Sequence, residues 1–278
     1  MKKYLVIGNP IGHSLSPLIH NYWIKKYCLK DSIYEKRKIE EKDLEIIIKE
    51  IREDEIVGVN VTVPFKKLII PFLDKLDLSA EETQSVNTLF KINNKIVGYN
   101  TDRNGFWDTI KNFYPTTKDS RKPPPLEGKR IFILGAGGVT SSIISALKNG
   151  GANNIILSNR TKEKANQLKK LFPELEVLDW GKRPSLCDIV INTTSIGLTK
   201  NEEIKVDFSD YDKNFHKNFL FYDLIYNPKE TVFLKKARLR GNKTMNGKMM
   251  FLNQAKYAFN IWTNIMPEID DEVIKLLD

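Results

Sequence analysis

The sequence of 278 residues predicts an α/β protein of two domains, the first with a mostly parallel sheet and the second of Rossmann type. Three observations support this fold class. Strand-like and helical patterns alternate over residues 1–114, a proline-rich stretch interrupts them at 115–128, and an apolar run with a glycine cluster begins a second alternation at residue 130. Such alternation is typical of sheets whose strands are joined by helical crossovers.

The first half of the chain gives the clearest strand. Valines at odd positions from 57 to 63 alternate with Gly58, Asn60 and Thr62, which is the period of a strand buried on at least one face. Pro64 ends it, because proline has no backbone donor. The expected elements are strands at 4–7, 33–39 and 57–63, helices at 18–27, 42–51, 68–78 and 105–113, and a hairpin at 91–99 with Asn93-Asn94 at its turn.

The second half begins after a predicted linker. Residues 115–128 carry four prolines and no apolar periodicity, so we expect an exposed connection between domains. A strand beginning at 130, a glycine cluster and a helix up to Gly150-Gly151 then form the first half of a βαβ unit. Further strands are expected at 154–157, 176–178, 188–192, 219–224 and 243–245, and further helices at 163–172, at 229–239, from 248 onward and at 268–277.

The composition, with 41% hydrophobic and 28% charged residues, is that of an ordinary soluble protein. No stretch approaches the roughly 18 apolar residues of a membrane span, and the first strand follows Met1 to Tyr4 without a signal-peptide pattern. We therefore expect a cytoplasmic protein with no membrane partner.

The net charge of +9 does not by itself predict nucleic-acid binding, because the lysines are scattered and no nucleic-acid-binding motif accompanies them. A lysine-rich solvated surface explains the charge best, and a small anionic ligand is the next explanation. Cys28 and Cys187 lie far apart with no histidine cluster nearby, so we expect neither a disulfide framework nor a metal site. Both are expected to be small buried apolar residues.

Lys66 lies where the strand at 57–63 gives way to a helix. Taken alone, Lys66 and Lys67 are most simply solvated charges, since most lysines are exposed. In open α/β sheets, however, ligands collect at the carboxyl ends of strands. The alternative is therefore that Lys66 is held over a pocket floored by Asn60 and Thr62.

Two further polar sets precede expected helices. Ser14 and Ser16 stand just before the helix at 18–27, where one hydroxyl can cap the helix or both can bind a carboxylate. Asn100-Thr101-Asp102 precedes the helix at 105–113 and can likewise be only a cap, with Asp102 favoured by the helix dipole. Both interpretations stay open for each set.

The glycine cluster favours a dinucleotide. Gly135 and Gly137 allow a tight turn and the approach of a pyrophosphate to a helix N-terminus, although Thr140 replaces the third glycine of the usual motif. The next strand is followed by Asn159-Arg160-Thr161, where an NAD enzyme would carry Asp or Glu. With Lys162 and Lys164 nearby, this stretch suits a 2′-phosphate and hence NADP, unless Arg160 is only a surface charge.

Two later assignments also have two interpretations. Asn192 to Ser195 can line the nicotinamide side of a cofactor site or form an ordinary turn. Gln254 is polar inside an otherwise apolar helical pattern. It is an exposed residue by default, and a pocket donor if its face turns inward.

With these residues assembled, the chain resembles the shikimate dehydrogenase family over essentially its full length. The matching motifs occur in one order, which makes them far more specific together than any of them alone. They are GNPIGHSLSP at 8–17, NVTVPFK at 60–66, SVNTL at 85–89, NTDRNG at 100–105, GAGGV at 135–139, NRT at 159–161, NTTSIG at 192–197, DLIYNP at 223–228 and the helix around Gln254.

The resemblance implies an NADP-dependent oxidoreductase that reversibly reduces 3-dehydroshikimate to shikimate, in the route to chorismate and the aromatic amino acids. It implies that Lys66 is catalytic and is paired with Asp102. The implied substrate-binding residues are Ser14, Ser16, Thr62, Asn87, Asp102, Tyr226 and Gln254, and the implied cofactor-binding residues are Gly135, Ala136, Gly137, Gly138, Val139, Asn159, Arg160, Thr161, Lys164, Thr194, Leu224 and Gly247.

The resemblance also implies a domain organisation. A substrate-binding and catalytic domain would comprise 1–114 together with the C-terminal helices at 248–278, and the NADP-binding domain would comprise 129–247, with the substrate in a cleft between them. Two residues depart from the family pattern: Met249 stands where a second glycine is usual, and Arg103 stands beside Asp102 where a small residue is common. We expect Met249 to alter the packing of the nicotinamide ring and Arg103 to favour the charged form of the Asp102 carboxyl group.

Other functions remain to be weighed against this one. The chain could be a quinate/shikimate dehydrogenase with broader substrate or NAD use, or a non-catalytic NADP-binding sensor on the same scaffold. The presence of Lys66, Asp102 and both serines argues against a sensor, which needs no proton donor. A basic nucleic-acid-binding protein is a third class, and it would bind DNA in a salt-sensitive way. We expect a small-molecule substrate, no nucleic-acid partner, and a monomer or homodimer.

Overall fold

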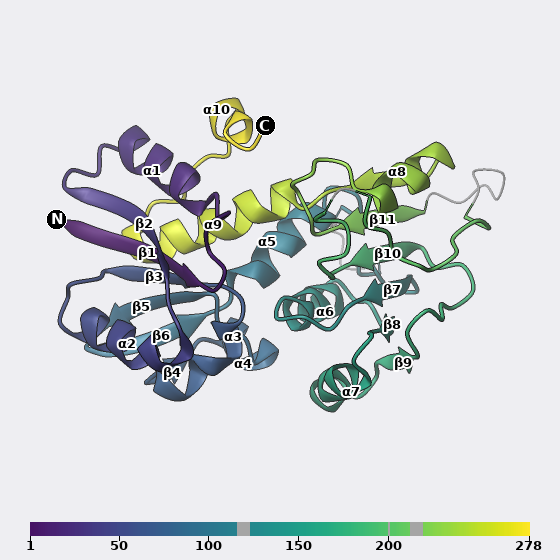
Figure 1. The fold of residues 1–278 in the computed structure, drawn as a ribbon, viewed down its shortest axis with the longest axis horizontal. Coiled ribbons are helices and arrows are strands. Elements are labelled where there is room, and N and C mark those ends of the chain that lie inside the picture. Colours follow the sequence, from purple (N-terminus) through teal and green to yellow (C-terminus); the bar gives the residue numbers. More distant parts are fainter. Residues whose placement is uncertain (116–122, 200, 212–218) are drawn as a thin grey trace. The chain divides into compact units, whose positions relative to one another are not determined.

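The computed structural model describes residues 1–115, 123–199, 201–211 and 219–278, which divide into two compact units (Figure 1). The first unit comprises residues 1–108 and 251–278, and the second comprises residues 109–250. Each unit contains a six-stranded sheet. Among the described residues, no helix is long and apolar enough to cross a membrane.

The sheet of the first unit has the strand order β2-β1-β3-β5-β6-β4. β1 pairs in parallel with β2 and β3, and β4 pairs in parallel with β6, whereas β5 is antiparallel to β3 and β6. The strands are β1 (Lys2–Gly8), β2 (Ser32–Lys38), β3 (Gly58–Val61), β4 (Lys75–Leu76), β5 (Thr88–Ile92) and β6 (Lys95–Tyr99). The sheet is therefore mixed, with three parallel and two antiparallel pairings among the described residues.

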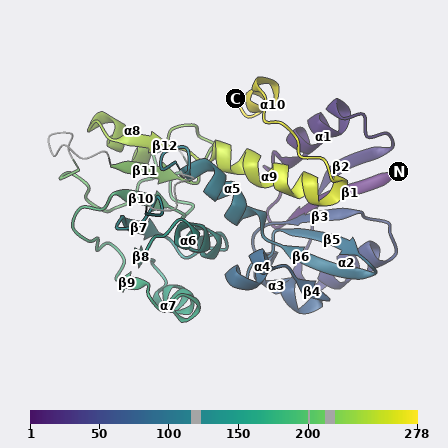
Figure 2. The same ribbon diagram turned by 180° about the vertical axis from the view of Figure 1, so that it is seen from behind.

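Helices lie on both faces of this sheet. Those made wholly of first-unit residues are α1 (Ser16–Lys26), α2 (Leu44–Arg52), α3 (Phe65–Leu68), α4 (Leu78–Thr83) and α10 (Asp271–Lys275), with short 3₁₀ turns at Glu41–Asp43 and Ile70–Phe72. Two longer helices, α5 (Thr101–Ile110) and α9 (Lys248–Thr263), have most of their residues in this unit. α2 and α9 lie on opposite sides of the strands when Figures 1 and 2 are compared.

The alternation in β3 sends its side chains to two different environments. Val59 and Val61 join the apolar cluster that contains the buried face of α2, including Leu44. Gly58, on the other face, is covered by the indole ring of Trp262 from α9, and a Cβ added to Gly58 would lie 2.3 Å from its Nε1 atom. Trp262 also donates a hydrogen bond of 3.0 Å to the carbonyl of Leu89. A glycine at position 58 therefore allows the C-terminal helix to pack on the sheet.

The sheet of the second unit is entirely parallel and has the order β12-β11-β10-β7-β8-β9. Its strands are β7 (Arg130–Leu134), β8 (Asn154–Ser158), β9 (Glu176–Leu178), β10 (Ile189–Asn192), β11 (Leu220–Asp223) and β12 (Lys243–Met245), and its helices are α6 (Thr140–Asn149), α7 (Lys162–Leu171) and α8 (Val232–Leu239). The strand order reverses between β7 and β10, as in a Rossmann fold. Ligands of such sheets bind at the carboxyl ends of the strands beside this reversal.

Several expectations from the sequence need correction. The helix expected at 68–78 is wrong: α3 ends at Leu68, a 3₁₀ turn contains Pro71, and Lys75–Leu76 pairs with β6. Pro71 cannot donate to a continued helix, and this is the physical reason for the break. Cys187 is buried as expected, but Cys28 is exposed, at a positive φ of 52° just after α1.

The expected hairpin is confirmed, because Ile92 pairs with Lys95 and both Asn93 and Asn94 have positive φ values. Half of the expected linker, residues 116–122, lies outside the described residues.

Candidate functional site

Lys66 and Asp102 form a buried ion pair in the first unit. The Lys66 Nζ atom lies 2.5 Å from Asp102 Oδ2, and the two side chains are only 11% and 8% exposed. Lys66 sits in the short helix α3 after Pro64, and its carbonyl accepts a hydrogen bond of 2.8 Å from the amide of Val86. Lys67 is exposed. Lys66 is therefore not a solvated charge, whereas Lys67 is one.

Asn100 caps helix α5 and leaves Asp102 available to the lysine. Its Oδ1 atom accepts a hydrogen bond of 3.2 Å from the amide of Arg103, while its Nδ2 atom donates to Ser85 O at 2.8 Å. The Arg103 guanidinium extends to Glu82, with 3.2 Å between Nη2 and Oε2. The cap and the ion pair thus belong to different residues of the same motif.

Asn87 is held in one orientation beside this pair. Its Oδ1 atom accepts from the amide of Thr101 at 2.8 Å and from the hydroxyl of Thr88 at 3.0 Å. Its Nδ2 atom donates to Thr101 Oγ1 at 2.9 Å and faces Gln254 Oε1 at 3.4 Å. The carbonyl side of the amide is saturated, so the N–H that meets Gln254 at the long distance of 3.4 Å, together with Gln254 itself, is the part that a ligand could engage most easily.

The two serines lie at the start of α1. Ser16 is 6% exposed and is the first residue of the helix, while Ser14 is half-buried and accepts the amide of Ser16 at the long distance of 3.4 Å. No side chain caps the helix at Leu15. Thr62 is half-buried at the end of β3, where a Cβ on Gly8 would lie 2.5 Å from its methyl carbon.

Tyr34, Thr88 and Thr101, to which the sequence analysis gave no role in the site, add further hydrogen bonds around Asn60 and Asn87. Tyr34 donates a hydrogen bond of 2.6 Å to Asn60 Oδ1, and Asn60 Nδ2 donates to Thr88 Oγ1 at 3.0 Å. Thr101 holds Asn87 from both sides, as described above. The signal that could have found them is Asn60 itself, because an amide buried in a valine-rich strand needs polar partners nearby.

The glycine loop of the second unit, residues 135–139, has open space on one side next to the start of helix α6. Gly135 has a φ of 107°, and a Cβ there would lie 2.7 Å from Thr193 Oγ1. A Cβ on Gly137, in contrast, would meet only one atom, at 3.8 Å. Helix α6 begins at Thr140 without a side-chain cap, and the Thr140 hydroxyl bonds to Gly135 O at 3.2 Å. Open space beside uncapped helix amides fits a pyrophosphate.

The residues after β8 divide into two kinds. Asn159 is structural, because its Oδ1 atom accepts the amide of Ala136 at 2.9 Å and its Nδ2 atom donates to Thr161 O at 2.7 Å. Arg160 and Lys164 are exposed, and neither has an ion-pair partner in the part of the chain that the structure describes. Lys162 instead pairs with Asp179 at 2.7 Å. The available cations for a phosphate at this strand end are therefore Arg160 and Lys164.

Leu224 and Gly247 touch through their backbones. A Cβ on Gly247 would lie 1.9 Å from Leu224 O, so no other residue fits at 247 without a shift. Asp223, just before Leu224, accepts from Thr231 Oγ1 at 2.7 Å and from Asn192 Nδ2 at 3.0 Å. Burial nevertheless raises the pKa of the Asp223 carboxyl group to about 6. Asp223 thus anchors the loop that carries Leu224.

Thr194 lies in a turn, and its own hydroxyl already makes two hydrogen bonds within that turn. Its Oγ1 atom donates to Asn192 Oδ1 at 2.6 Å and accepts the amide of Ile196 at 3.1 Å. These bonds define a local turn, and they are compatible with either interpretation given above. Val139 is the residue before α6, and Gly138 lies within the same loop.

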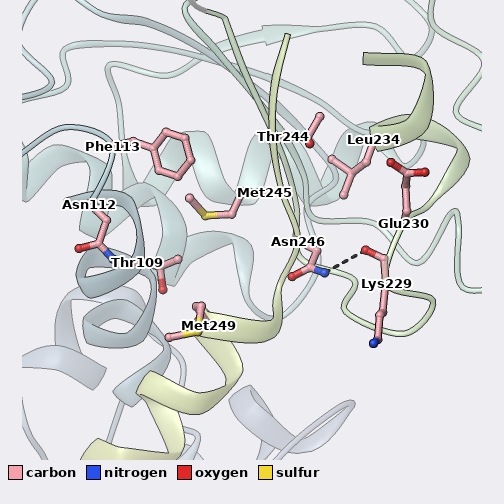
Figure 3. Close-up of a pocket in the computed structure, with 10 residues that line it drawn as sticks. All are labelled: Thr109, Asn112, Phe113, Lys229, Glu230, Leu234, Thr244, Met245, Asn246 and Met249. Carbon is pink, nitrogen blue, oxygen red and sulfur yellow. Dashed lines mark hydrogen bonds between the residues drawn. The ribbon is translucent and has the colours of Figure 1, made fainter. Parts of the chain in front are cut away.

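Met249 belongs to a pocket of about 430 Å³ within the second unit (Figure 3). Its side chain lies near Thr109, and Asn246 Nδ2 donates to Lys229 O at 2.9 Å on the far side. The lining residues are Thr109, Asn112, Phe113, Lys229, Glu230, Leu234, Thr244, Met245, Asn246 and Met249. Tyr226, from the same unit, is half-buried, and burial raises the pKa of its phenol to about 12.

In the first unit, the structure therefore places the Lys66–Asp102 pair next in the chain to Thr101, which bonds to Asn87, and Asn87 in turn meets Gln254. Tyr226, an expected substrate residue, is in the second unit together with every expected cofactor residue. Among the described residues, no group of three or more His, Cys, Asp or Glu side chains could hold a metal ion.

Comparisons with known proteins agree with this arrangement. Residues 6–89 match the family described as shikimate dehydrogenase substrate binding domain, and residues 118–230 match shikimate / quinate 5-dehydrogenase. The chain is 51% identical to the shikimate dehydrogenase (NADP(+)) of Pelagibacter ubique over 100% of this chain and 99% of that protein.

Solved structures of shikimate dehydrogenases are also similar to this chain over its full length. A shikimate dehydrogenase in complex with NADP+ has 34% identity and a TM-score of 0.87, covering 100% of this chain and 94% of that one. The shikimate 5-dehydrogenase of Thermus thermophilus in complex with NADP(H) and shikimate has 28% identity and a TM-score of 0.81, covering 100% and 98%. The chain belongs to the shikimate dehydrogenase family.

Proposed function

We propose that this protein is an NADP-dependent oxidoreductase that reversibly reduces 3-dehydroshikimate to shikimate in the biosynthesis of aromatic amino acids. The observation that carries this proposal is the buried Lys66–Asp102 pair next to an oriented amide, in a chain of this family. The reaction needs a proton donor and polar groups that bind a polyhydroxylated ring. The first unit has candidates for both in Lys66 and in the side chains near it. A sensor without catalysis would need neither.

The substrate is held through its carboxylate and its ring hydroxyls. Ser14 and Ser16 supply hydroxyls and a helix N-terminus for the carboxylate. Thr62, Asn87 and Gln254 supply hydrogen-bonding groups for the ring hydroxyls. Tyr226, a residue of the second unit, is a further proposed substrate-binding residue. Orientation by several fixed groups of this kind lowers the entropy cost of reaching the transition state.

NADP fits the second unit, and NADPH supplies the hydride when it is bound. The loop from Gly135 to Val139 receives the pyrophosphate at the start of α6, and Arg160, Thr161 and Lys164 receive the 2′-phosphate of the adenosine. Asn159 contributes indirectly, because its side chain accepts a hydrogen bond from the Ala136 amide of the loop. Thr194, Leu224 and Gly247 line the nicotinamide end.

Lys66 serves the carbonyl oxygen of the substrate. As an ammonium group it stabilises the developing alkoxide and donates a proton to that oxygen. Asp102 keeps the ammonium in place through the 2.5 Å contact and accepts a hydrogen bond from a ring hydroxyl with its free lone pairs. The roles of the individual residues follow the family and are tested below.

An assay with two ketones and two nucleotides tests the function. Oxidation of NADPH and of NADH is followed with 3-dehydroshikimate and with 3-dehydroquinate. We expect rapid oxidation only with NADPH and 3-dehydroshikimate. Comparable rates with 3-dehydroquinate or NADH would favour a quinate/shikimate dehydrogenase of broader use, and no oxidation with any pair would favour the sensor.

The domain assignment expected from the sequence, 1–114 with 248–278 for substrate and 129–247 for NADP, is part of the proposal. A cytoplasmic location and a monomeric or homodimeric state also stay predictions. Size-exclusion chromatography with light scattering measures the second of these directly.

A further inference from the structure

Tyr34 of β2 is buried against helix α1. The residue is 2% exposed, and the Asn21 side chain of α1 bonds to both its carbonyl and its amide, at 2.8 and 2.9 Å. The Tyr34 ring stacks on His20 of α1 with 4.2 Å between ring centroids and an interplanar angle of 4°. Two residues of α1 therefore contact Tyr34 directly, and the same helix starts at Ser16.

The phenol oxygen of Tyr34 connects two parts of the proposed substrate site. It donates a hydrogen bond of 2.6 Å to Asn60 Oδ1, and the Ser16 side chain is its second polar neighbour. Asn60 Nδ2 then donates to the carbonyl of Asn87 at 3.1 Å. A continuous buried path thus runs from Ser16 to Asn87.

The packing around Tyr34 requires only an aromatic ring. His20 is 1% exposed, and neither of its ring nitrogens has a hydrogen-bond partner among the described residues. Burial lowers the pKa of His20 to about 3, so the imidazole is neutral at physiological pH and stacks as an uncharged ring. Phenylalanine would satisfy these contacts without burying a hydroxyl, which is costly unless it is hydrogen-bonded. The hydroxyl is therefore explained by its two polar partners.

We propose that Tyr34 is a positioning residue that holds Ser16 at a fixed distance from Asn87 through Asn60. The inference rests on the proposed function, in which Ser16 binds the carboxylate and Asn87 a ring hydroxyl of one rigid substrate. Without the phenol hydroxyl, Ser16 loses its partner and Asn60 loses its donor. Binding of the carboxylate then weakens, whereas the Lys66–Asp102 pair is untouched.

The test compares Tyr34→Phe with Tyr211→Phe. Tyr211 is a matched control, because it is also buried and its phenol accepts a hydrogen bond of 2.8 Å from the amide of Cys187, within the second unit. For Tyr34→Phe we expect KM for shikimate to rise about five- to tenfold, with kcat within about threefold and KM for NADP unchanged. For Tyr211→Phe we expect all three constants to stay within about twofold.

A substrate without the carboxylate charge separates positioning from general damage. Wild type and Tyr34→Phe are assayed with shikimate and with its methyl ester. If Tyr34 positions Ser16, the preference of kcat/KM for shikimate over the ester falls about fivefold in the variant. An equal loss on both substrates, or an unchanged KM for shikimate, would overturn the proposal.

A second variant keeps the proposal testable if Tyr34→Phe does not fold. Asn60→Ser removes the acceptor of the phenol and leaves the tyrosine ring in its stack, and it should reduce the same preference. An unchanged preference in that variant would likewise count against positioning by Tyr34. If the wild-type protein does not oxidise shikimate, the proposed function and this inference both fail. If the wild type is active but both variants keep its preference for shikimate over the ester, only this inference fails.

Discussion

Lys66 Nζ lies 2.5 Å from Asp102 Oδ2, and both side chains are nearly inaccessible to solvent. An ion pair at this depth is costly to desolvate and is weak evidence for stability. We propose that it has a chemical use instead, beside Asn87 and Gln254.

Asp102→Asn should damage both turnover and substrate binding. The amide keeps the shape of the carboxyl group but leaves the Lys66 ammonium without its counter-charge, and removes an acceptor for a ring hydroxyl. We expect kcat to fall about 10²-fold or more and KM for shikimate to rise about tenfold. Steady-state kinetics over pH 6–10 measure both effects. A pH profile identical to that of wild type would argue against the pair.

Arg160→Ala should weaken NADP selectively. Arg160 is an exposed cation without an ion-pair partner among the described residues, at the strand end where a 2′-phosphate would lie. Loss of a charge-assisted hydrogen bond predicts a rise of about 10- to 100-fold in KM for NADP, with little change for NAD. Lys169→Ala, another exposed cation on α7, is the control and should leave KM for NADP unchanged. Equal behaviour of the two variants would contradict the assignment of Arg160.

Gly247→Ala should destabilise the second unit and weaken cofactor binding. The added Cβ would lie 1.9 Å from Leu224 O, and a backbone atom cannot move aside cheaply. We expect a lower melting temperature and a higher KM for NADP. Gly12→Ala is the matched control, because a Cβ there has no neighbour within 4 Å. Indistinguishable melting curves for Gly247→Ala and wild type would show that the loop tolerates the change.

Asp223→Asn should alter the pH dependence of stability. Burial raises the pKa of Asp223 to about 6 from an ordinary value of 3.8, so the folded state binds more protons than the unfolded state between these values. Wild-type stability therefore carries a contribution from Asp223 that falls as pH rises from about 4 to 6, by at most about 3 kcal/mol. The unfolding free energy of Asp223→Asn relative to wild type should rise over that interval. A constant difference between the two proteins would contradict the raised pKa.

Much of this arrangement was predictable from local patterns. The alternating valines of β3, the turn at Asn93-Asn94 and the glycine loop after β7 each reflect short-range physics, and the structure confirms them. The helix expected at 68–78 failed because Pro71 and a short strand pairing override its apolar spacing. Contacts between distant segments are a different matter, since periodicity does not say which strand lies beside which.

The site shows the same limit. Lys66 could be singled out only through the resemblance to the family, because its partner Asp102 is 36 residues away in the chain and Lys66 alone was most simply a solvated charge. Tyr34 could be suspected only from the buried amide of Asn60, because its partners lie on α1 and β3 and its own strand gives only a weak pattern. Residues that act through tertiary hydrogen bonds need a structure to be seen.

The most direct test of the central claim is Lys66→Ala, assayed for kcat and for shikimate affinity beside Lys67→Ala. We expect Lys66→Ala to lose about 10²- to 10⁴-fold in kcat, with shikimate binding changed by less than about threefold, and Lys67→Ala to behave like wild type. Unchanged turnover in Lys66→Ala would contradict the catalytic role of the buried lysine.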